Sequence, residues 1–395
     1  MSGLAITGVG AVTSSGAGIE SIEAALRGRA TPPLDVDRSA GYHRPGSSRR
    51  AYVASGVDLD GWVSPLAARR MCPASRYAVA AARQAAVGAG SEVLDDCAVI
   101  LSTAYGAADV TERLLRQIIL DGPEAASPAL FTESVANAPA AQVALGLKAR
   151  AANITITQRQ AGPALALRRA AAELAAGRCA QVVVGAVDEL NPILHAVLDR
   201  FGALARPDEN GVEVARPFDA RRSGFVAGEG AVVVFAERDP DEERVIARAT
   251  RTGCAFDPAA PRTSWPSDPA SLVEVLRMSL GDELADIDLV VSGGSGSPAG
   301  DRFEGRLLRR LFDGSPPPVL APKGILGEHG GAQLGGAIAV LGGASCGPTA
   351  GFAETDPDIG LTPYDGAPLA PPRKVLMTCL AAGGAAAWAV LERGL

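Results

Sequence analysis

Two continuous apolar runs do most to limit the fold of this chain. Residues 181–187 (QVVVGAV) and 230–236 (GAVVVFA) consist mainly of valine and alanine and do not alternate with polar residues. Such a run is typical of a strand that is buried on both faces of its sheet. The rest of the chain alternates between strand-like and helix-like patterns. Helices are therefore expected to cover the sheet, and the sequence predicts an α/β fold.

The predicted elements follow one another in two similar cycles, which meet near the charged stretch 239–243 (DPDEE). Further strands are expected at 4–13, 97–102, 153–157, 245–251, 289–292, 318–321, 375–380 and 387–392. Helices are expected at 19–29, 75–88, 107–121, within 128–147, and at 164–177, 271–284, 303–312 and 333–343. The repeated rhythm predicts two pseudo-symmetric halves, 1–240 and 241–395. Residues 31–61 are rich in Pro, Ser, Arg and Gly and are expected to form an exposed irregular excursion.

The composition argues against several classes of function. The 395 residues carry a net charge of −7 and only 4% aromatic side chains, which disfavours a nucleic-acid-binding face. Six scattered cysteines without a C-x-x-C pair indicate reduced thiols in the cytoplasm. The three histidines are too far apart in sequence to form a metal motif. The longest uncharged run, 330–353, is broken by Gln333, Pro348 and many glycines, so we expect no membrane span.

Residues 153–177 form the most informative local pattern: a strand, a tight turn and a long helix. Pro163 suits the first helical turn, where its fixed φ fits and its missing N–H is not needed. This geometry presents one side chain at a helix N-terminus, which is where enzymes place a nucleophile. The candidate positions hold Gln158, Arg159 and Gln160. A carboxamide or a guanidinium is not a usable nucleophile for acyl transfer, so the chain has the turn without the reactive group.

Four short motifs occur in a consistent order along the chain. They are Arg216-Pro-Phe-Asp219 followed by GFVAGEG at 224–230, SPAGDRFE at 297–304, KGILG at 323–327, and Gly383-Gly384. Together they resemble the β-ketoacyl synthases of the thiolase superfamily, nearly end to end. The resemblance implies a thiolase-like, five-layer αβαβα fold built from two pseudo-symmetric halves, and dimerisation. It also implies acyl groups presented on the phosphopantetheine of an acyl carrier protein, with no cofactor bound by the chain itself.

The resemblance also singles out residues that support the site. Lys323 begins one of the matching motifs. Arg216 and Asp219 are expected to brace the loop that carries Glu229.

The chain departs from that family at each catalytic position. Gln160 falls where the synthases have their nucleophilic Cys, Gly293 where they have the first His, and Glu328 where they have the second. His329 lies one residue late, and Ala382 replaces the gating Phe. This combination is similar to the chain-length factors, or ketosynthase β subunits, of bacterial type II polyketide synthases, in which Gln followed by Ala-Gly is characteristic.

The resemblance implies a non-condensing subunit that pairs with an active ketosynthase α subunit. It would complete the acyl tunnel at the dimer interface and limit the length of an aromatic or polyene polyketide. Ala108, Thr111 and Leu115 lie at i, i+3 and i+7, so they share one helical face, which is expected to line the tunnel together with Ala382. The small Ala108 predicts a roomy tunnel. The alternative is that this face only packs against the partner subunit.

Gln160 has two interpretations. It either fills the vacant nucleophile space, or it supports decarboxylation of malonyl-carrier or acyl transfer by the chain acting alone. Since both thioester-oxygen donors are missing, the first is favoured. A homodimeric thiolase-like binding protein is a further alternative.

Three smaller expectations concern individual charged groups. Glu328 and His329 are expected to be a satisfied or solvated pair. Arg159 is expected to form a structural ion pair, with contact to the partner subunit as the alternative. The arginines of the 31–61 excursion are expected to be solvated, with contact to an acidic carrier protein as the alternative.

Overall fold

The central sheets of the two halves have the same strand order. The computed structural model describes residues 3–91 and 94–394. The N-terminal half has the order β6-β5-β7-β9-β1, and the C-terminal half has the order β12-β11-β13-β14-β10. The bounds are β1 Leu4–Thr13, β5 Cys97–Ser102, β6 Asn153–Ile156, β7 Gln181–Asp188, β9 Gly230–Glu237, β10 Ala247–Phe256, β11 Leu289–Val291, β12 Val319–Leu320, β13 Lys374–Leu380 and β14 Ala385–Arg393.

The strand directions repeat as well. β5 runs parallel to β6 and β7, as β11 runs parallel to β12 and β13, and the other neighbours within each half are antiparallel. A short antiparallel pairing of β1 with β10 joins the halves into one 11-stranded sheet. The predicted pseudo-symmetry is therefore confirmed in the topology. The boundary at residue 240 stays a prediction.

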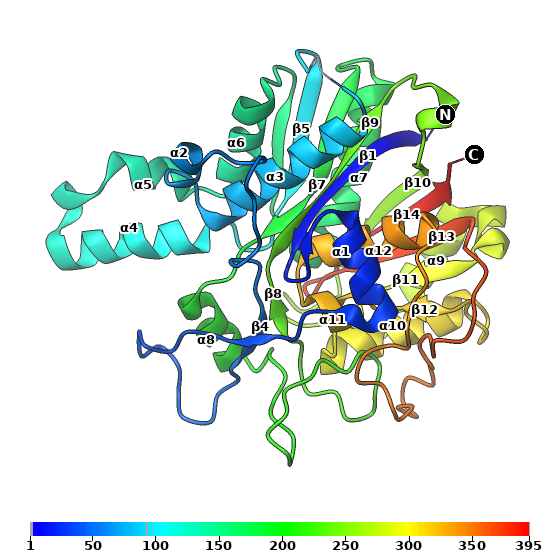
Figure 1. The fold of residues 1–395 in the computed structure, drawn as a ribbon. Coiled ribbons are helices and arrows are strands. Elements are labelled where there is room, and N and C mark those ends of the chain that lie inside the picture. The colour runs from blue at the N-terminus through cyan, green and yellow to red at the C-terminus, as the bar shows by residue number, and fades with distance from the viewer. Residues whose placement is uncertain (1–2, 92–93, 395) are drawn as a thin grey trace.

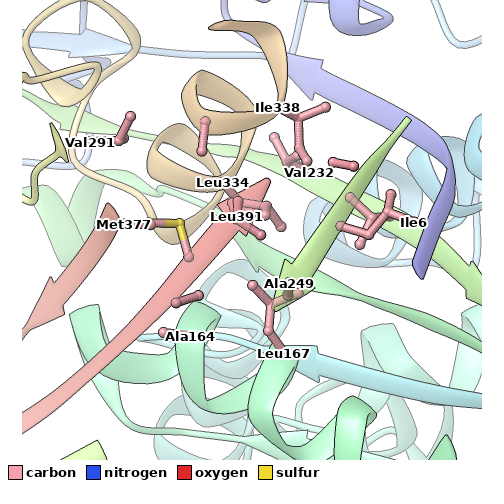
Figure 2. Close-up of a cluster of buried hydrophobic side chains, with 14 of the residues drawn as sticks. Ile6, Ala164, Leu167, Val232, Ala249, Val291, Leu334, Ile338, Met377 and Leu391 are labelled. Carbon is pink, nitrogen blue, oxygen red and sulfur yellow. The ribbon is translucent and has the colours of Figure 1, made fainter. Parts of the chain in front are cut away.

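Two helices form a layer between the halves of this sheet. α7 (Gly162–Ala175) and α12 (Gly330–Leu341) contact strands of both halves (Figure 1). Figure 2 shows their side chains Ala164, Leu167, Leu334 and Ile338 packed among strand residues from both halves.

Other helices cover the outer faces. α3 (Pro73–Gly88) and α6 (Ala138–Leu147) cover the N-terminal strands, and α9 (Ala270–Leu280) and α10 (Pro298–Leu311) cover the C-terminal strands. The layers run α, β, α, β, α, which confirms the expected five-layer fold.

The continuous apolar runs are explained by these layers. On β7, Val182 and Val184 face the central layer, while Val183 and Val187 face the outer layer under α3. Successive strand side chains point to opposite faces, so a strand covered on both sides needs apolar residues at every position.

The remaining elements surround this frame. They are β2 Gly16–Ala17, β3 Leu34–Asp35, β4 Arg50–Tyr52, β8 Ala227–Gly228, α1 Ile19–Ala24, α2 Pro65–Ala68, α4 Ala108–Asp121, α5 Pro128–Glu133, α8 Pro192–Arg200 and α11 Lys323–Leu326. α4 and α5 project from the body as an arm at the left of Figure 1.

Several predicted boundaries are wrong by a few residues, and local contacts explain most of the differences. α10 begins at Pro298 because the Ser297 hydroxyl caps it, accepting a hydrogen bond from the N–H of Gly300. α9 ends at Leu280 because Gly281 takes a positive φ of 54°. β10 extends to Phe256 because its pairing with β14 continues beyond the predicted end.

The 31–61 excursion is mostly irregular, as predicted, but it contributes two short strands. β4 pairs with β3 and also with β8 in a small separate sheet. Arg49 and Arg50 both pair with Asp35, so two of its arginines are not simply solvated.

The contact between α3 and β1 predicts a sensitive glycine. A Cβ added at Gly10 would lie 2.0 Å from the carbonyl oxygen of Ala81 on α3. Gly10→Ala is expected to lower the free energy of unfolding by about 3 kcal/mol, since the helix backbone must move away. Urea denaturation measures this loss. Gly56→Ala is the control, because Gly56 is exposed with open space around it. Equal stability of the two variants would contradict the close approach.

Candidate functional site

The strand, turn and helix predicted over 153–177 are present in the structure. β6 is followed by a 3-10 turn, Arg159–Ala161, and then by α7. Arg159 has a φ of +44°, in the left-handed region that non-glycine residues seldom adopt. Such backbone strain is typical of functional sites, where surrounding structure enforces it. The turn places Gln160, half-buried, just before the N-terminus of α7.

A small polar hollow lies beside Gln160. It is lined by Ala104, Tyr105, Arg159, Gln160, Asp188, Glu328, His329 and Gly330. Its volume is about 10 Å³, which is close to the least that holds one water molecule. The fold thus brings Gln160 and Glu328 together from distant parts of the sequence, as the motifs predicted. The hollow as it stands is too small for an acyl or malonyl group.

Glu328 is engaged in a buried ion pair. Its Oε1 lies 2.6 Å from Nζ of Lys323, and the two side chains are only 6% and 1% exposed. Two charges buried to this degree stabilise each other, because either one alone in the interior would be strongly destabilising. Glu328 therefore neutralises Lys323, at the position where the family resemblance predicts a histidine.

The space beside Gly293 is occupied by two other side chains. A Cβ added at Gly293 would lie 3.2 Å from Oε2 of Glu304 and 3.3 Å from Nε2 of Gln333. Glu304 accepts hydrogen bonds from the Gly293 N–H at 2.9 Å and from the Thr378 hydroxyl at 2.5 Å, and Gln333 donates to the Thr378 carbonyl. Burial raises the pKa of Glu304 to about 7. Any side chain at position 293 would have to displace this hydrogen-bond network.

His329 does not form the satisfied or solvated pair that was predicted. It is buried, and neither ring nitrogen has a hydrogen-bond partner among the described residues. Burial, followed by the charge of Lys323, lowers its pKa to about 3, so the ring is neutral. The prediction fails because Glu328 turns to Lys323, while the imidazole lies against Gly331.

Buried carboxylates fix the loops around the hollow. Asp188, at the end of β7, accepts from the N–H groups of Gly330 and Ala104. Glu229 accepts from the N–H groups of Ala54 and Leu190 and from the Tyr77 hydroxyl. Asp188 and Gln333 were missed in the sequence. The available signals were a carboxylate at the end of an apolar strand and a single amide in a helix otherwise made of small and aliphatic residues.

Two other expected supports contact different segments. Arg216 pairs with Asp208 at 2.8 Å. Asp219 accepts from Arg221 and from the N–H groups of residues 353 and 354. The prediction that Arg216 and Asp219 brace the loop of Glu229 is therefore wrong. These contacts fasten neighbouring loops instead.

The predicted ion pair of Arg159 is not found. Its side chain is exposed and forms no ion pair with any residue the structure describes, and its contact with a partner subunit stays a prediction. Arg159 is one of the residues that line the hollow.

The predicted tunnel face lies on α4, apart from the hollow. Ala108 is half-buried, Leu115 is 50% exposed, and the Thr111 hydroxyl contacts the carbonyls of Ala107 and Ser134. Ala382 is in the turn between β13 and β14, which is fastened by a bond from the Gly383 N–H to the Ser264 carbonyl. That these residues line a tunnel stays a prediction.

The remaining sequence-based expectations concern the cysteines, a metal site and a membrane span. The six cysteines are free thiols. Over residues 3–91 and 94–394, no helix is long and apolar enough to cross a bilayer, and no three potential metal ligands cluster.

Comparison with known proteins agrees with the fold. The model of the β-ketoacyl synthase N-terminal domain matches residues 1–242. The ketoacyl synthase β subunit of the tetracenomycin polyketide synthase of Streptomyces glaucescens is 29% identical over 381 residues, 90% of each chain. The actinorhodin polyketide putative β-ketoacyl synthase 2 of Streptomyces coelicolor is 30% identical over 318 residues, 75% of each chain. The solved ishigamide ketosynthase/chain length factor matches 99% of each chain with a TM-score of 0.87 and 27% identity.

The chain therefore belongs to the β-ketoacyl synthase family. Within that family, the predicted resemblance to the ketosynthase β subunits, or chain-length factors, of type II polyketide synthases is confirmed.

The buried ion pair predicts a large loss of stability when one partner is removed, and a recovery when both charges are removed. Glu328→Gln leaves the buried Lys323 ammonium without its anion and is expected to lower the free energy of unfolding by about 3–5 kcal/mol. Combining Lys323→Met with Glu328→Leu is expected to restore most of it, because neither charge then remains. Urea denaturation measures both.

The exposed pair Arg150–Asp95 is the matched control, at 78% and 71% exposure. Asp95→Asn is expected to change stability by less than about 1 kcal/mol. A loss from Glu328→Gln no larger than that of the control would refute the coupling of Lys323 to Glu328.

Proposed function

We propose that this protein is the non-condensing β subunit of a polyketide ketosynthase heterodimer. It pairs with an active ketosynthase α subunit, completes the acyl tunnel at their interface and limits the length of the polyketide chain. The observation that carries this proposal is the filled site. Gln160, Gly293 and Glu328 stand where the family resemblance predicts the three catalytic residues. Gln333 and Glu304 fill the space beside Gly293, and Lys323 pairs with Glu328.

The chemistry of condensation explains why this observation supports the proposal. Acyl transfer from a thioester needs a nucleophile, and decarboxylation of malonyl needs donors aimed at the thioester oxygen. Gln160 offers an amide, Gly293 has no side chain, and the Glu328 carboxylate is held by Lys323. Such a centre does not support condensation, whereas the fold around it is intact.

The surface supports a protein partner. Large apolar side chains are exposed on and near the arm formed by α4 and α5: Leu115, Ile119, Leu120, Phe131 and Leu145. An apolar patch of this kind is typical of a protein interface. The similar solved structure is that of a ketosynthase/chain length factor. We infer that an α subunit covers this arm.

The other parts of the proposal follow from the same role. An acyl carrier protein presents the acyl groups on its phosphopantetheine, and the chain itself holds no cofactor. A cytoplasmic location, in which the six free thiols stay reduced, belongs to the proposal.

Ala108→Phe tests the tunnel assignment. Added bulk on the α4 face is expected to shorten the main product by at least one two-carbon unit, because the tunnel is narrowed where the growing chain passes. Mass spectrometry of products from the heterodimer, carrier protein and malonyl donor measures the length. Ala175→Phe is the control, since it adds the same bulk at the exposed end of α7. Unchanged product length in Ala108→Phe would remove Ala108 from the tunnel.

A second function, decarboxylation of malonyl-carrier by Gln160, is favoured by one observation. His329 has unpartnered ring nitrogens, as far as the described residues go, and lines the same hollow as Gln160. The hollow of about 10 Å³ argues against it, because a malonyl group does not fit.

Release of labelled CO₂ separates the two functions. In a heterodimer whose α subunit lacks its nucleophile, Gln160→Ala and His329→Ala are expected to leave the release rate unchanged. A tenfold or greater decrease in either variant would establish decarboxylation by this chain.

A further inference from the structure

Glu112 connects the α4 helix to two other parts of the molecule. Its Oε1 accepts a hydrogen bond from the hydroxyl of Tyr42 at 2.6 Å, and its Oε2 accepts one from Nδ2 of Asn191 at 2.7 Å. Asn191 also donates to the carbonyl of Ala108 at 3.2 Å. Glu112 is one turn beyond Ala108 and three residues before Leu115, so it adjoins the predicted tunnel face.

The partners of Glu112 are themselves firmly held. Asn191 is 4% exposed, and its Oδ1 caps α8 by accepting from the N–H of Leu194 at 2.9 Å. The segment of Tyr42 is fastened to α8 as well. Nε2 of His43 lies 3.0 Å from Nδ1 of His195, and the N–H of Ser48 donates to Asp199 at 3.0 Å. Residues 42–48 and α8 therefore form one frame, to which Glu112 attaches α4.

The α4 helix has few other anchors. Val110 and Leu114 are its buried residues. Its first turn is held by Glu189, whose carboxylate accepts from the N–H groups of Asp109 and Ala74 and so joins α4 to α3. Because so little apolar area holds the projecting helix, a pair of charge-assisted hydrogen bonds one turn from its start has a large share in fixing its direction.

We propose that Glu112, held between Tyr42 and Asn191, is a positioning residue that sets the tilt of α4 and thereby the length of polyketide that the tunnel accepts. This proposal rests on the proposed function, since it concerns the same tunnel face. Residues 42–48 thus act on chain length without touching the growing chain.

Product length distinguishes this role from simple stabilisation. Tyr42→Phe and Glu112→Ala, each purified as the heterodimer, are expected to reduce the main product at least threefold in favour of products differing by one or more two-carbon units. Glu112→Gln keeps one acceptor oxygen and is expected to have a smaller effect. Size-exclusion chromatography and the melting temperature report whether the heterodimer and fold remain intact.

Arg113→Ala is the matched control. Arg113 is the next residue on the same helix, 58% exposed and paired only with Asp109 in the described structure. Its removal is expected to leave the product distribution unchanged. If Glu112→Ala does not fold, Tyr42→Phe removes one of the two hydrogen bonds to Glu112 with little change in shape and decides the question.

The possible outcomes separate the two proposals. If Tyr42→Phe leaves the distribution unchanged while Ala108→Phe shortens the product, the positioning role is overturned and the proposed function stands. If the chain does not pair with an α subunit, or condenses alone, the proposed function is overturned.

Discussion

The structure depends on one packing constraint: two sheet halves must share a single layer of helices. α7 and α12 are covered on both sides, so they contact strands of both halves at once. The backbone of α12 lies very close to its neighbours. A Cβ at Gly335 would lie 2.4 Å from a methyl carbon of Ile22, and one at Gly330 would lie 3.1 Å from Pro163 at the start of α7. Every residue of α12 is buried, which explains why its sequence consists almost entirely of small and aliphatic residues.

The same layer also bounds the polar hollow beside Gln160. Gln160 and Glu328 lie near the N-termini of α7 and α12, at the edge of this buried layer. A vacancy there would leave buried polar groups unpaired, and each would cost about 1–3 kcal/mol. The structure instead pairs Lys323 with Glu328 and fills the space beside Gly293 with Gln333 and Glu304. His329 is the exception, since its ring remains without partners in the described part of the chain. The side chains around the hollow and beside Gly293 therefore satisfy most of one another's charges and hydrogen bonds.

The fold and much of the site could be predicted from the sequence, because periodicity and motifs carry that information. The apolar runs identified β7 and β9, and the motifs predicted that Gln160 and Glu328 belong to one site. The partners of particular side chains could not be predicted. Arg216 and Asp219 contact segments whose position depends on the folding of long loops. The ring of His329 has no hydrogen-bond partner among the described residues, because the adjacent Glu328 pairs with Lys323 instead. Such pairings are decided by tertiary geometry, which local sequence does not contain.

The contrast between α7 and α4 shows where the molecule can vary. The buried face of α7 is fixed by apolar contacts with strands of both halves, so a change on that face is opposed by the interior. α4 has two buried side chains and is directed mainly by carboxylates: Glu189 at its N-terminus and its own Glu112 toward residues 42–48 and α8. Polar contacts of this kind are individually modest and depend on direction, so replacing one of them can turn the helix without unfolding the domain. In the proposed function α4 helps to set chain length, so its direction must be adjustable while the frame stays constant. The structure meets both requirements by separating them, with apolar packing in the central layer and hydrogen bonding at the arm.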